Sequence, residues 1–145
     1  MPRASHDGLS LDPLRMAAHG EAKEGNVDAR SLEVVADALA PGNEPVDVAW
    51  RIEGGRSAEG RPMLAVHVEG AVPLTCQRCL ASFEWPLART TRVLLARDEA
   101  ELAVLDNESD DEVIDGSARI GAQSLVGDEI LLTLPFAPVH PGACP

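Results

Sequence analysis

In the segment Met63-Leu-Ala-Val-His-Val-Glu-Gly-Ala-Val-Pro-Leu-Thr-Cys76, apolar residues recur at every second position on both sides of Gly70. A period of two is typical of a β-strand that buries one face. The pattern stops at Gly70 and restarts at Val72, so we interpret Gly70 as a bulge or bend. The stretch therefore predicts one long, half-buried strand.

Two further strands flank this one in the sequence. Residues 46–52 show the same alternation, and Gly54-Gly55 is expected to turn the chain after them. Residues 83–96 also predict a strand, and the candidates for its inner face are Trp85, Leu87, Val93 and Leu95. Two hairpins in succession imply an antiparallel meander.

Helices are predicted near both ends of the chain. Asp12 can cap a helix that begins at Pro13 and ends near Gly20. Residues 28–39 carry apolar side chains at helical spacing and predict an amphipathic helix, the apolar positions being Leu32, Val35, Ala36 and Leu39. Residues 121–134 predict a last helix, which stops at Pro135 and should bury Ile130, Leu131 and Leu134.

These elements predict a single α+β domain over residues 1–145. We expect an antiparallel sheet of about four or five strands, with N-terminal and C-terminal helices packed on it. No stretch approaches the roughly 20 apolar residues of a membrane span, and the N-terminus lacks the pattern of a signal peptide. We therefore expect a cytoplasmic protein with no membrane partner.

Acidic side chains outnumber basic ones by 24 to 12, which gives a formal net charge of −12. Such a charge repels nucleic acid and anionic membranes at long range and favours a basic protein partner. The acids are densest between Asp98 and Asp115, where no basic residue occurs. This segment predicts a solvated acidic loop near residues 98–112, followed by a short edge strand at Val113 and Ile114.

Three cysteines and one histidine form two short-spaced pairs, which are Cys76 with Cys79 and His140 with Cys144. Their number and kind match a zinc site with three thiolates and one imidazole, provided that the fold brings the tail back to the first pair. Two alternatives remain: plain buried or surface thiols on a tight turn, and a thiol redox pair. The redox pair is disfavoured because strands flank it on both sides.

Arginines gather in the otherwise acidic chain between Gly70 and Arg97. Arg78, Arg89 and Arg92 lie near the aromatic residues Phe83 and Trp85, a combination that can contact RNA phosphates and stack on bases. The alternative is an ordinary solvated strand face whose arginines pair with acidic neighbours. No serine-histidine-aspartate set, phosphate-binding glycine loop or two-histidine metal helix appears, so we expect neither an enzyme nor a small-molecule substrate.

Several short motifs occur in a specific order, and they are Leu11-Asp-Pro-Leu14, Val68-Glu-Gly-Ala-Val72, Cys76-Gln-Arg-Cys79, Val126-Gly-Asp-Glu-Ile-Leu-Leu-Thr-Leu-Pro135, Pro138-Val-His140 and Cys144. In this order they resemble the YceD-like family, whose members are called large ribosomal RNA subunit accumulation proteins. The resemblance implies a non-enzymatic factor needed for accumulation of 23S ribosomal RNA. It also places family positions on Arg78, Asp128 and Glu129. Relatives usually continue past the position of Pro145, so any role of that segment is expected to be absent here, or the chain to be incomplete.

Three functions follow from these expectations. The first is support of large-subunit assembly by binding a basic ribosomal protein, which the net charge favours. The second is direct binding of ribosomal RNA through the arginine-bearing hairpin. The third is a zinc-stabilised interaction module with another function.

Overall fold

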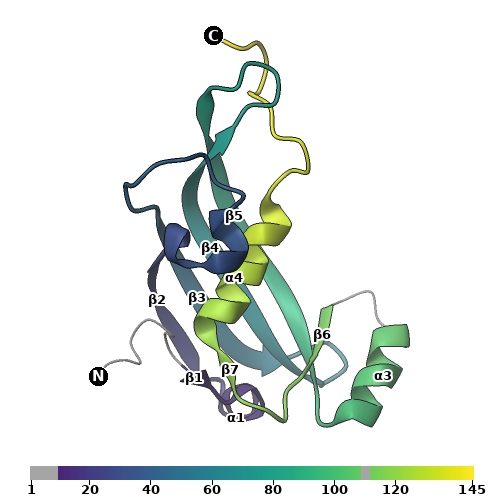
Figure 1. The fold of residues 1–145 in the computed structure, drawn as a ribbon. Helices are drawn as coiled ribbons and strands as arrows, with labels where there is room; N and C mark the ends of the chain where they lie inside the picture. Colours follow the sequence, from purple (N-terminus) through teal and green to yellow (C-terminus); the bar gives the residue numbers. More distant parts are fainter. Residues whose placement is uncertain (1–9, 109–111) are drawn as a thin grey trace.

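The computed structural model describes residues 10–108 and 112–145. Its main element is a five-stranded sheet in the order β2–β3–β4–β5–β6 (Figure 1). The strands are β2 (Ala22–Asp28), β3 (Asp47–Arg56), β4 (Pro62–Thr75), β5 (Ser82–Ala96) and β6 (Glu112–Asp115). Neighbours are antiparallel except β6, which is parallel to β5. The predicted α+β class and the mostly antiparallel sheet are confirmed.

Strands β4 and β5 form a long hairpin that carries the cysteine pair at its tip. Their register runs without interruption from Met63 opposite Leu94 to Thr75 opposite Ser82. The predicted single long strand is therefore confirmed, but Gly70 is not a bulge, because a bulge would shift this register. Gly70 instead adopts a φ of 151°, a backbone conformation that residues with a side chain rarely take.

Three helices, α1 (Pro13–His19), α2 (Glu33–Ala36) and α4 (Ala122–Thr133), lie on one face of the sheet (Figure 1). Helix α1 contacts β3 and β4, and α4 contacts β4 and β5. Alternate residues of β4 point into this layer and are buried, namely Leu64, Val66, Val68, Val72 and Leu74. A two-stranded pair, β1 (Ser10–Leu11) with β7 (Ile120–Gly121), ties the N-terminal segment to the start of α4.

Helix α1 has the predicted boundaries, since Asp12 caps its first turn and Gly20 ends it with a φ of 64°. The turn predicted at Gly54-Gly55 is wrong, because β3 continues through both glycines and the chain turns at residues 57–60 instead. A Cβ atom on Gly54 would overlap with the carbonyl oxygen of Met16. Gly54 is therefore needed for the close approach of α1 to the sheet.

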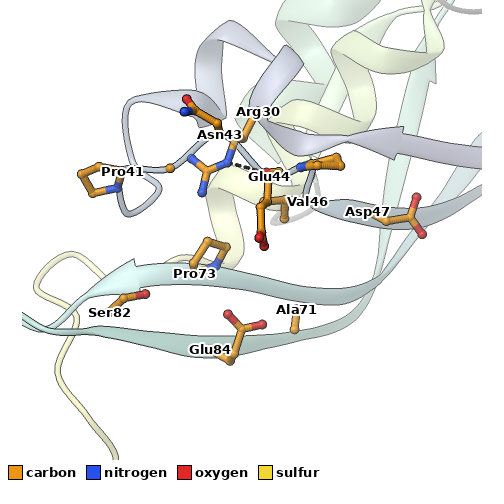
Figure 2. A pocket seen from close by; sticks show the side chains of 12 residues that line it. Arg30, Pro41, Asn43, Glu44, Val46, Asp47, Ala71, Pro73, Ser82 and Glu84 are labelled. Atoms are coloured by element: carbon orange, nitrogen blue, oxygen red, sulfur yellow. Dashed lines mark hydrogen bonds between the residues drawn. The ribbon is translucent and has the colours of Figure 1, made fainter.

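The amphipathic helix predicted over residues 28–39 is wrong. Strand β2 occupies its start, a 3₁₀ turn (Ala29–Ser31) follows, and α2 is only four residues long. Arg30 holds the next loop by donating from Nε to the carbonyl of Glu44 at 2.8 Å (Figure 2) and from Nη1 to the carbonyl of Ala40 at 2.9 Å. The predicted apolar residues Leu32, Val35 and Leu39 are nevertheless buried.

The predicted acidic loop is also wrong over most of its length, because residues Glu99–Glu108 form helix α3. Asp98 accepts a hydrogen bond from the backbone N–H of Glu101 at 2.8 Å and so caps the first turn. Leu105 of this helix is buried. Asp110 and Asp111 lie outside the described residues, and the short edge strand predicted after them is confirmed as β6.

Helix α4 has nearly the predicted span, but its buried face differs from the predicted one. Ile130 is fully buried, whereas Leu131 is 41% exposed and Leu134 is half-buried. Glu129, one residue earlier, is buried instead. In the described part of the chain, no helix combines the length and the apolar character that crossing a membrane requires.

Candidate metal centre

The tip of the β4–β5 hairpin is a tight turn that presents two cysteines on the same side. The N–H of Cys76 donates to the carbonyl of Ala81 at 2.9 Å, and the N–H of Leu80 donates to the carbonyl of Cys76 at 2.8 Å. Leu80 has a φ of 65°, in the left-handed region that usually requires glycine. The two hydrogen bonds hold Leu80 in this strained conformation and fix the positions of both thiols.

The proline-rich tail after α4 returns to this turn, as Figure 1 shows. The carbonyl of Pro138 accepts from the backbone N–H of Gln77 at 2.8 Å. The Arg78 guanidinium donates from Nη2 to two tail carbonyls, those of His140 at 2.9 Å and Gly142 at 2.7 Å. The tail is thus fastened to the turn on both sides of His140.

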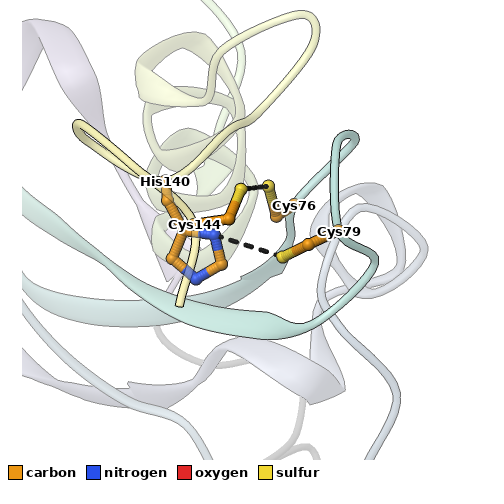
Figure 3. Close-up of side chains that lie close together, drawn as sticks. All are labelled: Cys76, Cys79, His140 and Cys144. Atoms are coloured by element: carbon orange, nitrogen blue, oxygen red, sulfur yellow. Dashed lines mark hydrogen bonds between the residues drawn. The ribbon is translucent and has the colours of Figure 1, made fainter.

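The folded tail places its own two donors beside the two cysteines (Figure 3). One ligand atom from each of Cys76, Cys79, His140 and Cys144 lies within 4.8 Å of all the others. Cys76 Sγ is 3.7 Å from Cys144 Sγ, and Cys79 Sγ is 3.5 Å from His140 Nδ1. All four predicted ligands therefore meet at one point, in an arrangement that can hold a metal ion, and the 60-residue separation in sequence is bridged by the fold.

The electrostatics of the turn favour a thiolate at Cys76. Burial acts to raise the pKa of Cys76, but backbone hydrogen bonds from Cys79, His140 and Arg78 outweigh it and hold this pKa at about 5. Burial, followed by hydrogen bonds with the other two thiols, raises the pKa of Cys144. Cys76 is therefore ionised at neutral pH, which is the form that binds metal.

Two contributors to the centre were not predicted from the sequence. Gln77 acts through its backbone N–H, which no sequence pattern reveals. Phe83 lies against the candidate ligand His140, with ring centroids 4.9 Å apart and planes tilted by 35°. The only signal for Phe83 is an aromatic residue in a chain with few of them, four residues after Cys79.

The three predicted contact arginines do not share a surface. Arg78 binds the tail, as described above. Arg89 lies on the helix-covered face of β5, where its Nε is 2.7 Å from the carboxylate of the buried Glu129 on α4. Arg92 lies opposite Ala65 on the other face and is exposed. Two of the three arginines thus make contacts within the protein.

The buried Glu129 has its charge compensated within the fold. Its Oε1 accepts from the Thr91 hydroxyl at 2.6 Å, in addition to the ion pair with Arg89. A buried carboxylate is stable only when it is paired and hydrogen-bonded in this way. The family position predicted at Glu129 therefore fastens α4, and with it the start of the tail, to the sheet.

Comparison with known proteins supports the resemblance seen in the sequence. No solved structure gives a significant match. Residues 64–145, which contain nearly all of the long hairpin, α4 and all four candidate metal ligands, match the family "Large ribosomal RNA subunit accumulation protein YceD". Because this match covers more than half of the chain, the protein belongs to the YceD family of large ribosomal RNA subunit accumulation proteins.

Proposed function

We propose that this protein is a non-enzymatic factor for accumulation of 23S ribosomal RNA, which acts in the cytoplasm by binding a basic protein of the large ribosomal subunit. The family supports the role in accumulation of the large-subunit RNA. The net charge of −12 supports a basic partner, because opposite charges accelerate encounter and like charges oppose it.

Arg78 and Arg89 both contact other parts of the same chain, and this observation favours a protein partner over RNA. An RNA surface on the hairpin would need several free cations on one face to neutralise neighbouring phosphates. Arg78 instead donates to the tail, and Arg89 neutralises Glu129. The remaining charge of the protein is strongly negative, which suits lysine-rich and arginine-rich partners.

We further propose that the metal is zinc, held by Cys76, Cys79, His140 and Cys144. In a tetrahedron with Zn–S bonds of about 2.3 Å and a Zn–N bond of about 2.05 Å, two sulfurs lie about 3.8 Å apart and a sulfur and a nitrogen about 3.6 Å. The corresponding separations here are 3.7 Å and 3.5 Å. All four positions of the tetrahedron are filled by protein, so the ion would have the structural role of fixing the tail.

A second candidate function is direct contact with ribosomal RNA. It is favoured by Arg92, which is exposed and has no ion pair with any described residue. On the same face His67 and Thr90 lie next to it, joined by a hydrogen bond of 2.8 Å. A single free arginine is a weak electrostatic site, so this candidate ranks second.

Binding assays with both kinds of partner decide between the two functions. Purified basic large-subunit proteins and 23S ribosomal RNA are each titrated at low and at physiological salt. We expect tight binding to at least one of the proteins, and RNA binding that is weak and lost as salt rises. Tight RNA binding at physiological salt that is abolished in Arg92→Ser would favour the second function instead.

A further inference from the structure

A groove lies beside the long hairpin, away from the metal ligands. It has a volume of about 630 Å³ and is bounded on one side by the loop of residues 41–46 and on the other by the start of β5. Ala71 and Pro73 of β4 also line it (Figure 2). Its volume lies within the roughly 300–1,000 Å³ of typical ligand sites, which suits a short segment of chain better than a folded domain.

The loop wall is held rigidly in place. Besides the two hydrogen bonds from Arg30 to loop carbonyls, the N–H of Ala40 donates to the carbonyl of Pro73 at 2.9 Å. At the other end of the loop, the N–H of Val46 donates to the carboxylate of Asp28 at 2.9 Å. A groove with fixed walls loses little entropy when it binds, which favours recognition by this surface.

Three carboxylates line the groove against one guanidinium, that of Arg30. Glu44 and Glu84 point toward the same space from opposite walls (Figure 2). Neither of them forms an ion pair with a described residue. Within residues 10–108 and 112–145, the Asp47 carboxylate accepts a hydrogen bond only from the side-chain amide of Asn26, at 2.9 Å. The groove therefore presents unpaired negative charge from two sides.

Apolar surface accompanies this charge, because Pro41, Pro45 and Pro73 contribute to the lining. Lysine and arginine combine a long aliphatic stem with a cationic end, so such a segment can pack its stems on the prolines while its charges reach the carboxylates. Nucleic acid does not fit, since its phosphates would face the same carboxylates.

We infer that this groove is where the protein holds an extended lysine- and arginine-rich segment of its basic client. The inference rests on the proposed function and adds the place of contact. It excludes the other acidic surface, helix α3, as the main contact.

Two matched triple variants test the inference. The groove variant is Glu44→Gln, Asp47→Asn and Glu84→Gln, and the control on α3 is Glu99→Gln, Asp106→Asn and Glu108→Gln. Both remove three negative charges by the same substitutions at exposed positions. The probes are purified basic large-subunit proteins and a fluorescent, unstructured peptide of alternating lysine, arginine and glycine.

We expect the groove variant to lose about tenfold or more in affinity for both probes and the control to lose less than about threefold. Equal losses in the two variants would overturn the inference while leaving the proposed function intact. Absence of binding between the wild type and every basic protein would overturn both.

Hydrogen exchange on the wild-type protein makes the test independent of variant folding. The peptide should slow exchange in residues 41–47 and 82–84 and leave α3 unchanged. Protection of α3 without protection of the groove would overturn the inference.

Discussion

Ile130 and Leu131 are neighbours on α4 and give a matched pair for testing which face of this helix is buried. Ile130 is 0% exposed and Leu131 is 41% exposed. Ile130→Ala removes three buried carbons, worth about 2.4 kcal/mol at about 0.8 kcal/mol each, and the cavity raises this to about 3–4 kcal/mol. The higher helix propensity of alanine offsets about 0.4 kcal/mol of this loss, so the free energy of unfolding should fall by about 3 kcal/mol.

Leu131→Ala removes the same number of carbons from a position that is largely in water. Its cost should stay below about 1 kcal/mol, again reduced slightly by helix propensity. Urea unfolding, followed by the fluorescence of Trp50 and Trp85 with zinc in constant excess, measures both variants. With a slope of about 2 kcal/mol/M, the midpoint should shift by about 1.5 M for Ile130→Ala and by less than about 0.5 M for Leu131→Ala. Equal shifts in the two variants would refute the assignment of the buried face.

Three further predictions concern the sheet, the acidic residues and the tail. Gly54→Ala should destabilise the protein by about 1–3 kcal/mol or more, because the added Cβ meets the backbone of α1. Gly55→Ala should be tolerated, because the nearest atom to its Cβ is a methyl group 4.0 Å away. Thermal unfolding of the two variants measures the difference. Burial, and then the negative charges on α4, raise the pKa of Glu112, so its ionisation disfavours the folded state and stability should fall as the pH rises above about 4. Glu112→Gln should remove this fall and exceed the wild type in stability near pH 7 but not at pH 3, as read from urea midpoints. Arg78→Gln should lower zinc affinity by about 10- to 100-fold in a chelator competition, because it frees two tail carbonyls, while Arg92→Gln should leave it unchanged.

Strict periodicity makes the long hairpin predictable, and cap residues make α1 predictable. The alternation from Met63 to Cys76 has the same phase on both sides of Gly70, and the structure buries the predicted side of it. Asp12 and Gly20 are the cap residues that a short helix requires. In these segments, local preference and tertiary packing agree.

The errors arose where tertiary contacts override local patterns. Strand β2, Ala22–Asp28, is mostly exposed and polar, so nothing but its pairing with β3 reveals it. Residues 28–39 have the apolar spacing of one helix but form a 3₁₀ turn and a short helix. The reason is that the side chains of Asp28 and Arg30 form hydrogen bonds to backbone groups there. The charge of the acidic segment predicts a loop, although its alanine, leucine and glutamate residues favour a helix.

The candidate site was predictable in its ligands but not in its surroundings. The chemistry and spacing of the cysteines and the histidine predict a set of four residues, and the structure brings these four together. The contacts of Arg78 and Arg89 depend on which face of the hairpin each occupies and on which segment returns to it. From the sequence alone, Arg78, Arg89 and Arg92 are all candidates for partner binding, and this role stays a prediction.

The most direct test of the proposed metal site is X-ray absorption at the zinc edge of protein purified without chelator. We expect about one zinc per chain, coordinated by three sulfurs at about 2.3 Å and one nitrogen at about 2.0 Å. Cys76→Ser should lose the metal. A folded protein that contains no zinc, or zinc bound by oxygen ligands, would contradict the account of Cys76, Cys79, His140 and Cys144 as one metal site.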